Sequence, residues 1–374
     1  MRRLLCAVVA ALAWTASAHA AVASPIPNAR AYYVVNASNG EVLAAHDAHV
    51  ELPIASITKL MTVIVALQHL KLDDEVTVSG SAAQVGESSI PLVRGQRITV
   101  RDLLKGALIQ SANNAADALA DAASGGNVGR FVAWMNARAR ALGLHHTHFE
   151  RPDGLDAPGH VSSARDVAVL AQVAMHSRLV RELVGERTDT IEGGRFVVHT
   201  WNDLLGLVPG MIGVKTGHTN DAGWCQVAAV RANGYTIYAV ILGSPTRAQR
   251  NEDLQRLLTW GVSQYHTSTL VRRAVYAHVG LGYGKAPVAL VARGTLVRVV
   301  RAGRPLVERV IAPSAVSLPV VRGQRLGRIE LWDGHKLLGT RPLLAARSVS
   351  RPGFGGRLRW YATRTGHHLL GLFT

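Results

Sequence analysis

The stretch Pro53-Ile54-Ala55-Ser56-Ile57-Thr58-Lys59-Leu60-Met61 decides how this sequence is interpreted. From Ser56 to Leu70 the chain is apolar on nearly every face, which predicts a buried central helix. Ser56 and Lys59 are one turn apart and share a face of that helix. A backbone N–H at a helix start has no partner within the helix, and the helix dipole favours negative charge there. The stretch therefore indicates a hydroxyl beside an amine, next to a place where an oxyanion can rest.

A serine hydroxyl is a poor nucleophile at neutral pH and needs a neighbouring base. No histidine lies within the turn that holds Ser56, whereas Lys59 does. Burial and a second nearby cation would lower the pKa of Lys59 until it can accept the proton, and Lys215 is the candidate for that cation. Taken alone, the pattern also fits a capped helix start, so Ser56 as nucleophile and Lys59 as general base need support from other motifs.

A second motif, Ser111-Ala112-Asn113, is expected at a bend before a helix. Helix capping would explain both Ser111 and Asn113. As parts of a site, Ser111 would relay a proton between Lys59 and a leaving amine, and Asn113 would hydrogen-bond a substrate amide.

A third motif, Lys215-Thr216-Gly217, is expected at the end of a strand. There Lys215 and Thr216 offer a cation and a hydroxyl to a terminal carboxylate. Gly217 would leave room for substrate backbone along the strand edge, and the N–H of His218 would supply a second oxyanion donor. Each motif alone is weak, but the three in this order indicate a serine acyl-transfer site.

The first twenty residues predict export. Arg2-Arg3 precedes an apolar run from Leu4 to Trp14, and Ala18-His19-Ala20 is an A-x-A cleavage signal. The apolar run is too short to cross a bilayer as a helix, so residues 1–20 are expected to be a removed signal peptide. The mature chain then keeps one cysteine, Cys225, which excludes an internal disulfide.

The net charge of +16 is unevenly spread along the chain. Residues 21–270 carry 21 Lys+Arg against 22 Asp+Glu, whereas residues 271–374 carry 18 against 3. This asymmetry indicates two regions with different tasks, and the basic region would favour an anionic surface. In an exported protein that surface would be lipid headgroups or cell-wall polyanions before nucleic acid. A solvated basic surface without a specific partner is the alternative. The sequence has no nucleic-acid motif, and we expect no nucleic-acid partner.

Hydrophobic periodicity predicts an α/β layered domain followed by a small all-β domain. Ala31–Val35 and Glu41–Ala45 should form a hairpin, and Ser163 with Asp166 should cap a helix reaching about Met175. The other expected helices are Arg101–Ala123, Phe131–Leu142 and Leu254–Gln264, and the expected strands are Val227–Val230, Tyr235–Leu242, Val288–Val291, Leu296–Val300, Val307–Ile311, Arg328–Leu331 and Lys336–Leu338. After Pro352, apolar and arginine residues interleave in a tail that could lie on a membrane, although its glycines leave a frayed tail as the alternative.

Over nearly the whole mature chain the sequence resembles the D-alanyl-D-alanine carboxypeptidase family, the low-molecular-mass penicillin-binding proteins, which share the three motifs with class A β-lactamases. The further stretches that carry the resemblance are Leu103-Leu104, Gly154-Leu155, Gly159-His160, Ser162-Ser163-Ala164, Asn202 with Leu204-Leu205, Gly213-Val214, Thr219, Ala222-Gly223, Gly323-Gln324, Gly327 and Pro342-Leu343. Two positions depart from the family pattern. Ala112 replaces the usual Gly, and Asn114 replaces the usual Asp, which puts helix capping in doubt rather than the chemistry.

The resemblance implies a serine D-Ala-D-Ala carboxypeptidase that trims peptidoglycan stem peptides through an acyl-enzyme at Ser56, with neither metal nor cofactor and with β-lactams as acylating inhibitors. It implies a three-layer D,D-peptidase domain, in which helices flank an antiparallel sheet, over residues 21–265. A basic all-β domain would follow over 270–348, with a membrane-associating tail over 349–374. The protein would then be periplasmic or otherwise extracytoplasmic, at the outer face of the cytoplasmic membrane.

Three other functions stay open at this point. A class A β-lactamase would need an E-x-x-L-N pattern for its deacylating glutamate, and none of Glu182, Glu186 and Glu192 begins one. A D,D-endopeptidase would differ only in how the cleft accepts the acyl-donor side. A non-catalytic penicillin-binding receptor would have no need of a base beside Ser56.

Overall fold

The computed structural model describes residues 7–14 and 23–370. The chain divides into two compact units, residues 22–263 and residues 264–374 together with 1–21. The first is a layered α/β unit and the second is built mainly of β-strands, so the predicted fold class is confirmed.

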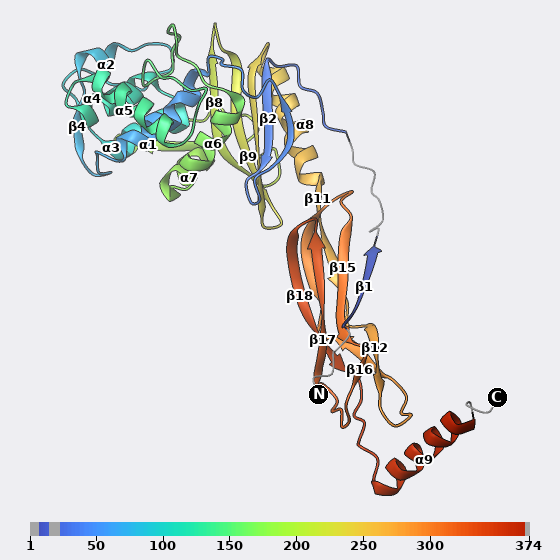
Figure 1. The fold of residues 1–374 in the computed structure, drawn as a ribbon. Helices are drawn as coiled ribbons and strands as arrows, with labels where there is room; N and C mark the ends of the chain where they lie inside the picture. The colour runs from blue at the N-terminus through green and yellow to red at the C-terminus, as the bar shows by residue number, and fades with distance from the viewer. Residues whose placement is uncertain (1–6, 15–22, 371–374) are drawn as a thin grey trace. The chain divides into compact units, whose positions relative to one another are not determined.

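The first unit is organised around a five-stranded antiparallel sheet with strand order β3-β2-β10-β9-β8 (Figure 1). Its strands are β2 (Ala31–Asn36), β3 (Glu41–His46), β8 (Met211–Thr219), β9 (Gly223–Ala232) and β10 (Tyr235–Ser244). The predicted hairpin and both predicted strands are present. The strand β8, which carries the third motif, lies at the edge of the sheet.

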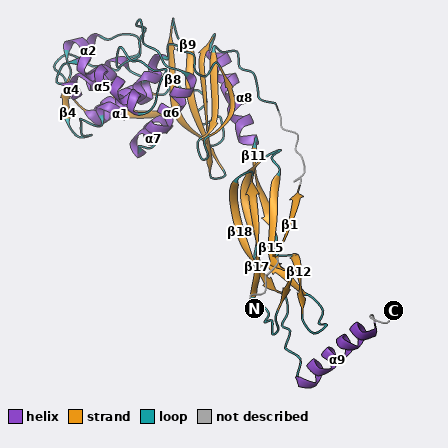
Figure 2. Cartoon of the chain, in the orientation of Figure 1, coloured by secondary structure: helices purple, strands orange, loops and turns teal. Residues whose placement is uncertain are grey.

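Helices cover both faces of this sheet (Figures 1 and 2). Helix α8 packs on β9 and β10, and α6 packs on β2 and β10. Because both faces are covered, β10 is buried along nearly its whole length, as its continuous apolar sequence requires. The helices are α1 (Lys59–Ala66), α2 (Gly80–Gln84), α3 (Val100–Lys105), α4 (Asn113–Ser124), α5 (Val128–Ala141), α6 (Ala164–Ala174), α7 (Arg178–Gly185) and α8 (Arg247–Ser263).

Three predicted helices differ from the structure, and one of them, Leu254–Gln264, is the C-terminal part of α8, which begins at Arg247. The stretch that starts at Ser56 begins with a 3-10 turn, η1 (Ala55–Thr58), and α1 ends at Ala66 rather than Leu70. The predicted helix Arg101–Ala123 is broken into α3, a π-helical turn η2 (Gly106–Gln110) and α4. The break is local, because Ser111 adopts a left-handed φ of 63° and ends the helical path.

Helix α1 is the core of the first unit. Of its side chains only Ile64 is not buried, so even Lys59 is withdrawn from water. The unit's other buried groups include the thiol of Cys225, whose pKa is raised to about 11 by burial. Burying the charged Lys59 ammonium costs free energy unless each of its N–H donors has a hydrogen-bond acceptor. The groups around Lys59 therefore determine whether its amine is charged or neutral.

Smaller pairs of strands complete the first unit: β4 (Glu75–Thr77) with β5 (Arg97–Thr99), and β6 (Thr188–Ile191) with β7 (Phe196–His199), which flank the 3-10 turn η3 (Glu192–Gly194). None of these short elements was predicted. Helix α6 begins as expected, with the Asp166 N–H donating to Ser163 Oγ at 3.2 Å.

The second unit holds a seven-stranded sheet with strand order β1-β15-β17-β18-β13-β12-β16 and a separate pair, β11 and β14. All five predicted strands are present, and β17 and β18 extend beyond their predicted ends. The strands are β1 (Ala7–Trp14), β11 (Tyr265–Val271), β12 (Val275–Leu281), β13 (Val288–Ala292), β14 (Leu296–Arg301), β15 (Leu306–Pro313), β16 (Ala315–Val316), β17 (Arg325–Asp333) and β18 (Lys336–Ala345).

The two ends of the chain belong to the second unit. Strand β1, from the predicted leader, pairs antiparallel with β15, whereas the predicted cleavage signal at residues 18–20 lies outside the described residues. In the tail, α9 (Phe354–Leu370) forms despite its glycines. No helix in the described part of the chain is long and apolar enough to cross a membrane.

The loop between α5 and α6 supports the turn that holds Ser56. Gly154 has a φ of +84°, and a Cβ added there would lie 2.2 Å from the carbonyl oxygen of Ala55. No residue larger than glycine fits between this loop and η1.

We predict that Gly154→Ala destabilises the protein by about 3 kcal/mol, because a left-handed alanine and a backbone clash add together. Gly40→Ala is the matched control, since Gly40 has a φ of +75° with nothing within 4 Å, and should cost only about 1 kcal/mol. Denaturant unfolding of both variants measures the difference, and equal losses would contradict the close packing of the loop against η1.

Candidate active site

Lys59 lies at the junction of three chain segments. Its Nζ is 2.7 Å from Ser56 Oγ, 2.7 Å from Asn113 Oδ1 and 2.6 Å from the carbonyl oxygen of Asp153. Three acceptors match the three donors of an ammonium. When the amine is neutral, one of these directions carries its lone pair, and of the three partners only the Ser56 hydroxyl has a proton to give. The geometry therefore pairs a nucleophile with its base.

The pKa of Lys59 is lowered to about 8, chiefly by burial, against which the carboxylates of Asp153, Asp117 and Glu87 raise it. The expected effect of burial is present, and the cation Arg151 adds to it. The repulsion between Lys59 and Lys215 appears in the pKa of Lys215, which burial, then Lys59 and then Arg250 lower well below its usual range.

Ser111 and Lys215 form a second hydroxyl–amine pair. Lys215 Nζ donates to Ser111 Oγ at 2.7 Å and to the Thr216 carbonyl at 2.8 Å. Ser111 was expected to interact with Lys59, but its hydrogen-bonding partner is Lys215. Ser111 adopts a left-handed conformation, which is strained for a residue other than glycine and persists only where the surrounding structure enforces it. Residues in such conformations are concentrated at functional sites.

Asn113 uses both ends of its amide within the protein. Oδ1 accepts from Lys59, and Nδ2 donates to the Gly86 carbonyl at 3.0 Å. The expected bond to a substrate amide would therefore have to displace Gly86. The next residue, Asn114, accepts a hydrogen bond from the Ile90 N–H and donates one to the Ile90 carbonyl. No side chain caps α4. The asparagine that departs from the family pattern therefore fixes the loop around Ile90.

Strand β8 runs directly beside Ser56. A Cβ added at Gly217 would lie 2.8 Å from the Ile54 carbonyl oxygen and 3.1 Å from the Ser56 nitrogen. Gly217 is therefore needed for the approach of β8 to η1, whereas we had expected it to make room for substrate. His218 is exposed, and its ring lies against Trp224 with the centroids 4.0 Å apart and the ring planes tilted by 32°.

These elements enclose a cavity of about 240 Å³. Its lining residues are Ser56, Glu87, Ser88, Ser111, Trp201, Thr216, Gly217, His218, Trp224, Arg247 and Arg250. The predicted residues Lys59, Asn113 and Lys215 lie behind its wall, each at most 2% exposed. The cavity thus presents hydroxyls on its surface and keeps the amines that act on them out of water.

The cavity is also lined by two arginines of α8, Arg247 and Arg250, which were not predicted from the sequence. Arg250 is 1% exposed, and burial lowers its pKa to about 10, so it stays charged at neutral pH. Arg247 forms a bidentate ion pair with Asp203 and lies over the Trp201 ring at 5.4 Å. Trp201 is 45% exposed and lines the cavity. The sequence signal was weak, because nothing in the spacing links residue 201 to the start of α8.

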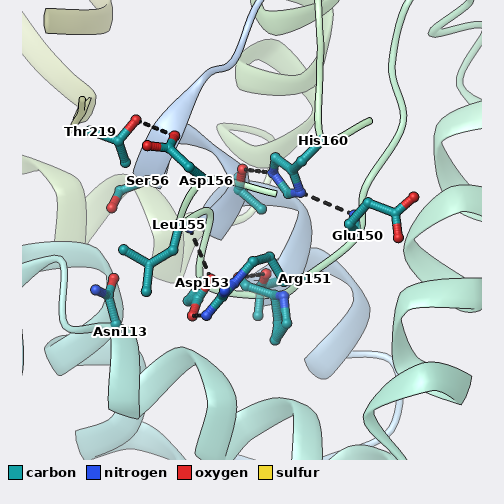
Figure 3. A network of polar contacts seen from close by, with 12 residues as sticks. Ser56, Asn113, Glu150, Arg151, Asp153, Leu155, Asp156, His160 and Thr219 are labelled. Carbon is teal, nitrogen blue, oxygen red and sulfur yellow. Dashed lines mark hydrogen bonds and ion pairs between the residues drawn. The ribbon is translucent and has the colours of Figure 1, made fainter. Parts of the chain in front are cut away.

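The loop of residues 150–160 ties these parts together (Figure 3). Arg151 binds the buried Asp153 carboxylate through two bonds of 2.7 Å, and Thr219 of β8 donates to Asp156 at 2.6 Å. Figure 3 shows His160 reaching toward Glu150, whose backbone N–H donates to Nδ1 at 3.0 Å. Nε2 must then carry the proton, which it donates to Thr58 Oγ1 at 2.8 Å. His160 therefore links Thr58 of η1 to the loop at Glu150.

Comparisons with known proteins agree with this geometry. A family model described as D-alanyl-D-alanine carboxypeptidase matches residues 18–246. The chain is 33% identical over 371 residues to the D-alanyl-D-alanine carboxypeptidase DacC of Escherichia coli, covering 91% of this chain and 89% of that protein. It is 31% identical over 339 residues to DacF of Bacillus subtilis, covering 87% of each chain. Penicillin binding protein 5 from Haemophilus influenzae superposes with a TM-score of 0.65 at 27% identity, covering 88% of this chain and 100% of that one.

His160 should make stability depend on pH. Burial lowers its pKa to about 4, so between its unfolded pKa of about 6.5 and pH 4 only the unfolded chain takes up the proton. Its contribution is therefore complete above pH 6.5 and is lost as the pH falls. Wild type should lose about 2 kcal/mol more unfolding free energy between pH 7.5 and pH 5 than His160→Gln, which cannot titrate. Denaturant unfolding at both pH values checks this, and parallel losses would contradict a buried neutral imidazole.

Proposed function

The chain belongs to the D-alanyl-D-alanine carboxypeptidase family, and on that premise we propose that it removes the terminal D-Ala from peptidoglycan stem peptides through an acyl-enzyme at Ser56. The family makes it a serine-type hydrolase and a penicillin-binding protein. The observation that carries the residue assignment is the 2.7 Å contact between Lys59 Nζ and Ser56 Oγ.

The first step is attack on the penultimate D-Ala carbonyl. A Lys59 pKa of about 8 leaves roughly a tenth of the amine neutral at pH 7, which is enough to supply a base. As the Ser56 oxygen bonds to the carbonyl carbon, its proton passes to Lys59 Nζ. The resulting Lys59 ammonium still has three hydrogen-bond acceptors, so its charge is compensated although it is buried.

The negative charge that develops on the carbonyl oxygen needs donors. The N–H groups of Ser56 and His218 are the proposed pair, which the close approach of Gly217 to the Ser56 nitrogen supports. Thr216, Lys215 and Arg250 would bind the terminal carboxylate. Lys215 can take up a proton when that carboxylate arrives, because its pKa in the free protein is low.

Collapse of the tetrahedral intermediate expels D-alanine. Its amine needs a proton, which Ser111 would donate while taking one from Lys215 at 2.7 Å. Water would then attack the ester carbonyl and give one proton to Ser111, which returns one to Lys215 at 2.7 Å, while the Ser56 oxygen leaves with the proton held by Lys59. Atoms and protons balance over the cycle, with the peptide and one water giving D-alanine and the shortened peptide.

We propose further that residues 1–20 are removed on export and that the mature protein works outside the cytoplasm, beside the membrane. The basic balance of residues 271–374 supports attraction to anionic lipid. In α9, Phe354, Leu358 and Tyr361 are 77%, 62% and 55% exposed, and these apolar groups accompany arginines. Such a helix fits a membrane surface rather than a span.

The decisive experiment is incubation of the mature chain with a peptide ending in D-Ala-D-Ala, measuring free D-alanine. Wild type should release D-alanine and be labelled by fluorescent penicillin, whereas Ser56→Ala should do neither, because no other group takes the place of its oxygen. The circular dichroism spectrum of the variant should match wild type. Labelling that persists in Ser56→Ala would refute the nucleophile, and labelling without D-alanine release would indicate a receptor.

Truncation after residue 350 tests the tail. The shortened protein should stop sedimenting with vesicles that contain anionic lipid while keeping its D-alanine release, because the cavity lies wholly within residues 22–263. The full mature chain on zwitterionic vesicles is the control. Unchanged sedimentation of the truncated protein would contradict a membrane role for α9.

A further inference from the structure

A second cavity of about 240 Å³ in the first unit shares no lining residue with the active-site cavity. Its lining residues are Ser81, Ala82, Val85, Asp117, Asp121, Val128, Arg151 and Pro152. Asp121 accepts a hydrogen bond from Ser79 Oγ, whereas the Asp117 carboxylate has neither a hydrogen bond nor an ion pair within the described part of the chain. Oδ1 of Asp117 is nevertheless shielded from water, and a buried carboxylate oxygen without a donor costs free energy.

Asp117 lies on the face of α4 that meets Lys59. Asn113, whose Oδ1 accepts from Lys59 Nζ at 2.7 Å, is the first residue of α4. Asp117 follows Asn113 by four residues, so the two side chains are neighbours on one face of the helix. Since α4 packs against α1, this face brings the Asp117 carboxylate toward the helix that carries Lys59.

The 150–160 loop connects the two groups a second time. Arg151 lines the second cavity together with Asp117, and it binds the Asp153 carboxylate through two bonds of 2.7 Å. The carbonyl oxygen of Asp153 in turn accepts from Lys59 Nζ at 2.6 Å. Because the guanidinium of Arg151 is bonded to Asp153, the charge of Asp117 has no ion-pair partner of its own.

Three further helices pack against α4, and their charged side chains leave Asp117 without a partner. Helix α2 has no charged side chain. The charged side chains of α3 have partners elsewhere, Arg101 with Asp73, Asp102 with the Glu192 N–H and Lys105 with Asp189. Those of α5 are Arg130, Arg138 and Arg140. Among the carboxylates of α2 to α5, Asp117 is therefore the one without a hydrogen bond.

The electrostatics of Asp117 and Lys59 follow from this arrangement. Burial raises the pKa of Asp117 to about 7 and Asp153 adds to this, whereas Arg151 and then Lys59 oppose it. For Lys59, burial lowers the pKa to about 8, and the carboxylates of Asp153 and then Asp117 have the largest opposing effects. The other charged groups that act on either one are Asp121 of α4 and Glu87 of the loop after α2.

Asp117 thus changes its charge near the pH at which Lys59 must lose its proton, so the two groups titrate as a coupled pair. While Asp117 is neutral, it does not attract the proton on Lys59. Once ionised, it opposes the loss of that proton and stabilises the ammonium that forms when Ser56 gives its proton to Lys59.

We propose that Asp117 is a positioning residue for the reaction, whose carboxylate sets the pH at which Lys59 begins to act as a base. This inference rests on the proposed function. Asp117 does not line the active-site cavity, so it acts through Lys59 and not on the substrate.

The test is the pH profile of Asp117→Asn, which keeps the shape of the side chain and removes its charge. Both kcat/KM for D-alanine release and the second-order rate of labelling by fluorescent penicillin are measured from about pH 5.5 to about pH 9.5. In wild type both should rise with a midpoint near the Lys59 pKa of about 8. In the variant the midpoint should fall by about half a pH unit and the plateau rate by about twofold, because Lys59 becomes a weaker base.

Asp121→Asn is the matched control, because Asp121 lines the same cavity one turn further along α4. Its midpoint should equal that of wild type, and so should that of Asp117→Glu, which keeps the charge. The melting temperature of Asp117→Asn at pH 8 should match or exceed that of wild type, because a charge that burial disfavours is gone.

An unshifted midpoint in Asp117→Asn, or an equal shift in Asp121→Asn, overturns the inference and leaves the proposed function standing. A lower melting temperature with an unshifted midpoint would mean that Asp117 serves only the fold, and it overturns the inference too. A wild type that neither releases D-alanine nor is labelled by penicillin overturns the proposed function as well.

Discussion

The amine of Lys59, withdrawn entirely from water, is the constraint on which the rest of the site depends. A buried ammonium requires every donor to be satisfied, and Lys59 meets this with Ser56, Asn113 and Asp153. These partners come from η1, the start of α4 and the loop before α6. One buried amine therefore holds together the segments that make up the wall of the cavity, and the same burial makes the amine a base at neutral pH.

Close backbone packing serves the same end. Gly154 and Gly217 allow a loop and a strand edge to approach η1 from two sides, where any side chain would collide with main-chain atoms of residues 54–56. Ala55 and Ser111 hold left-handed conformations within the site. Hydrogen bonds and core packing on all sides, rather than local preference, keep these residues in place.

The sequence predicted the fold class, the hairpin, about half of the other described strands and the convergence of Ser56, Lys59, Ser111 and Lys215. Those elements follow from periodicity and short motifs, which are local signals. The break in the helix after Lys105 was not predicted, because Gly106–Gln110 is a good helical sequence and only the left-handed Ser111 ends it. Nor were Arg250, Trp201 and Glu87 predicted as lining residues. Their roles depend on which loops meet around the cavity, and no spacing along the chain encodes that.

Cys225, the free cysteine in the described part of the chain, is buried, and this has a chemical consequence. At a pKa of about 11, only on the order of one Cys225 molecule in 10⁴ is a thiolate at pH 7, and the sulfur is shielded from solvent. Oxidants and low-molecular-weight disulfides react with exposed thiolates, so they have almost nothing to attack. Cys225 can therefore stay a thiol under oxidising conditions for as long as the fold around it is intact.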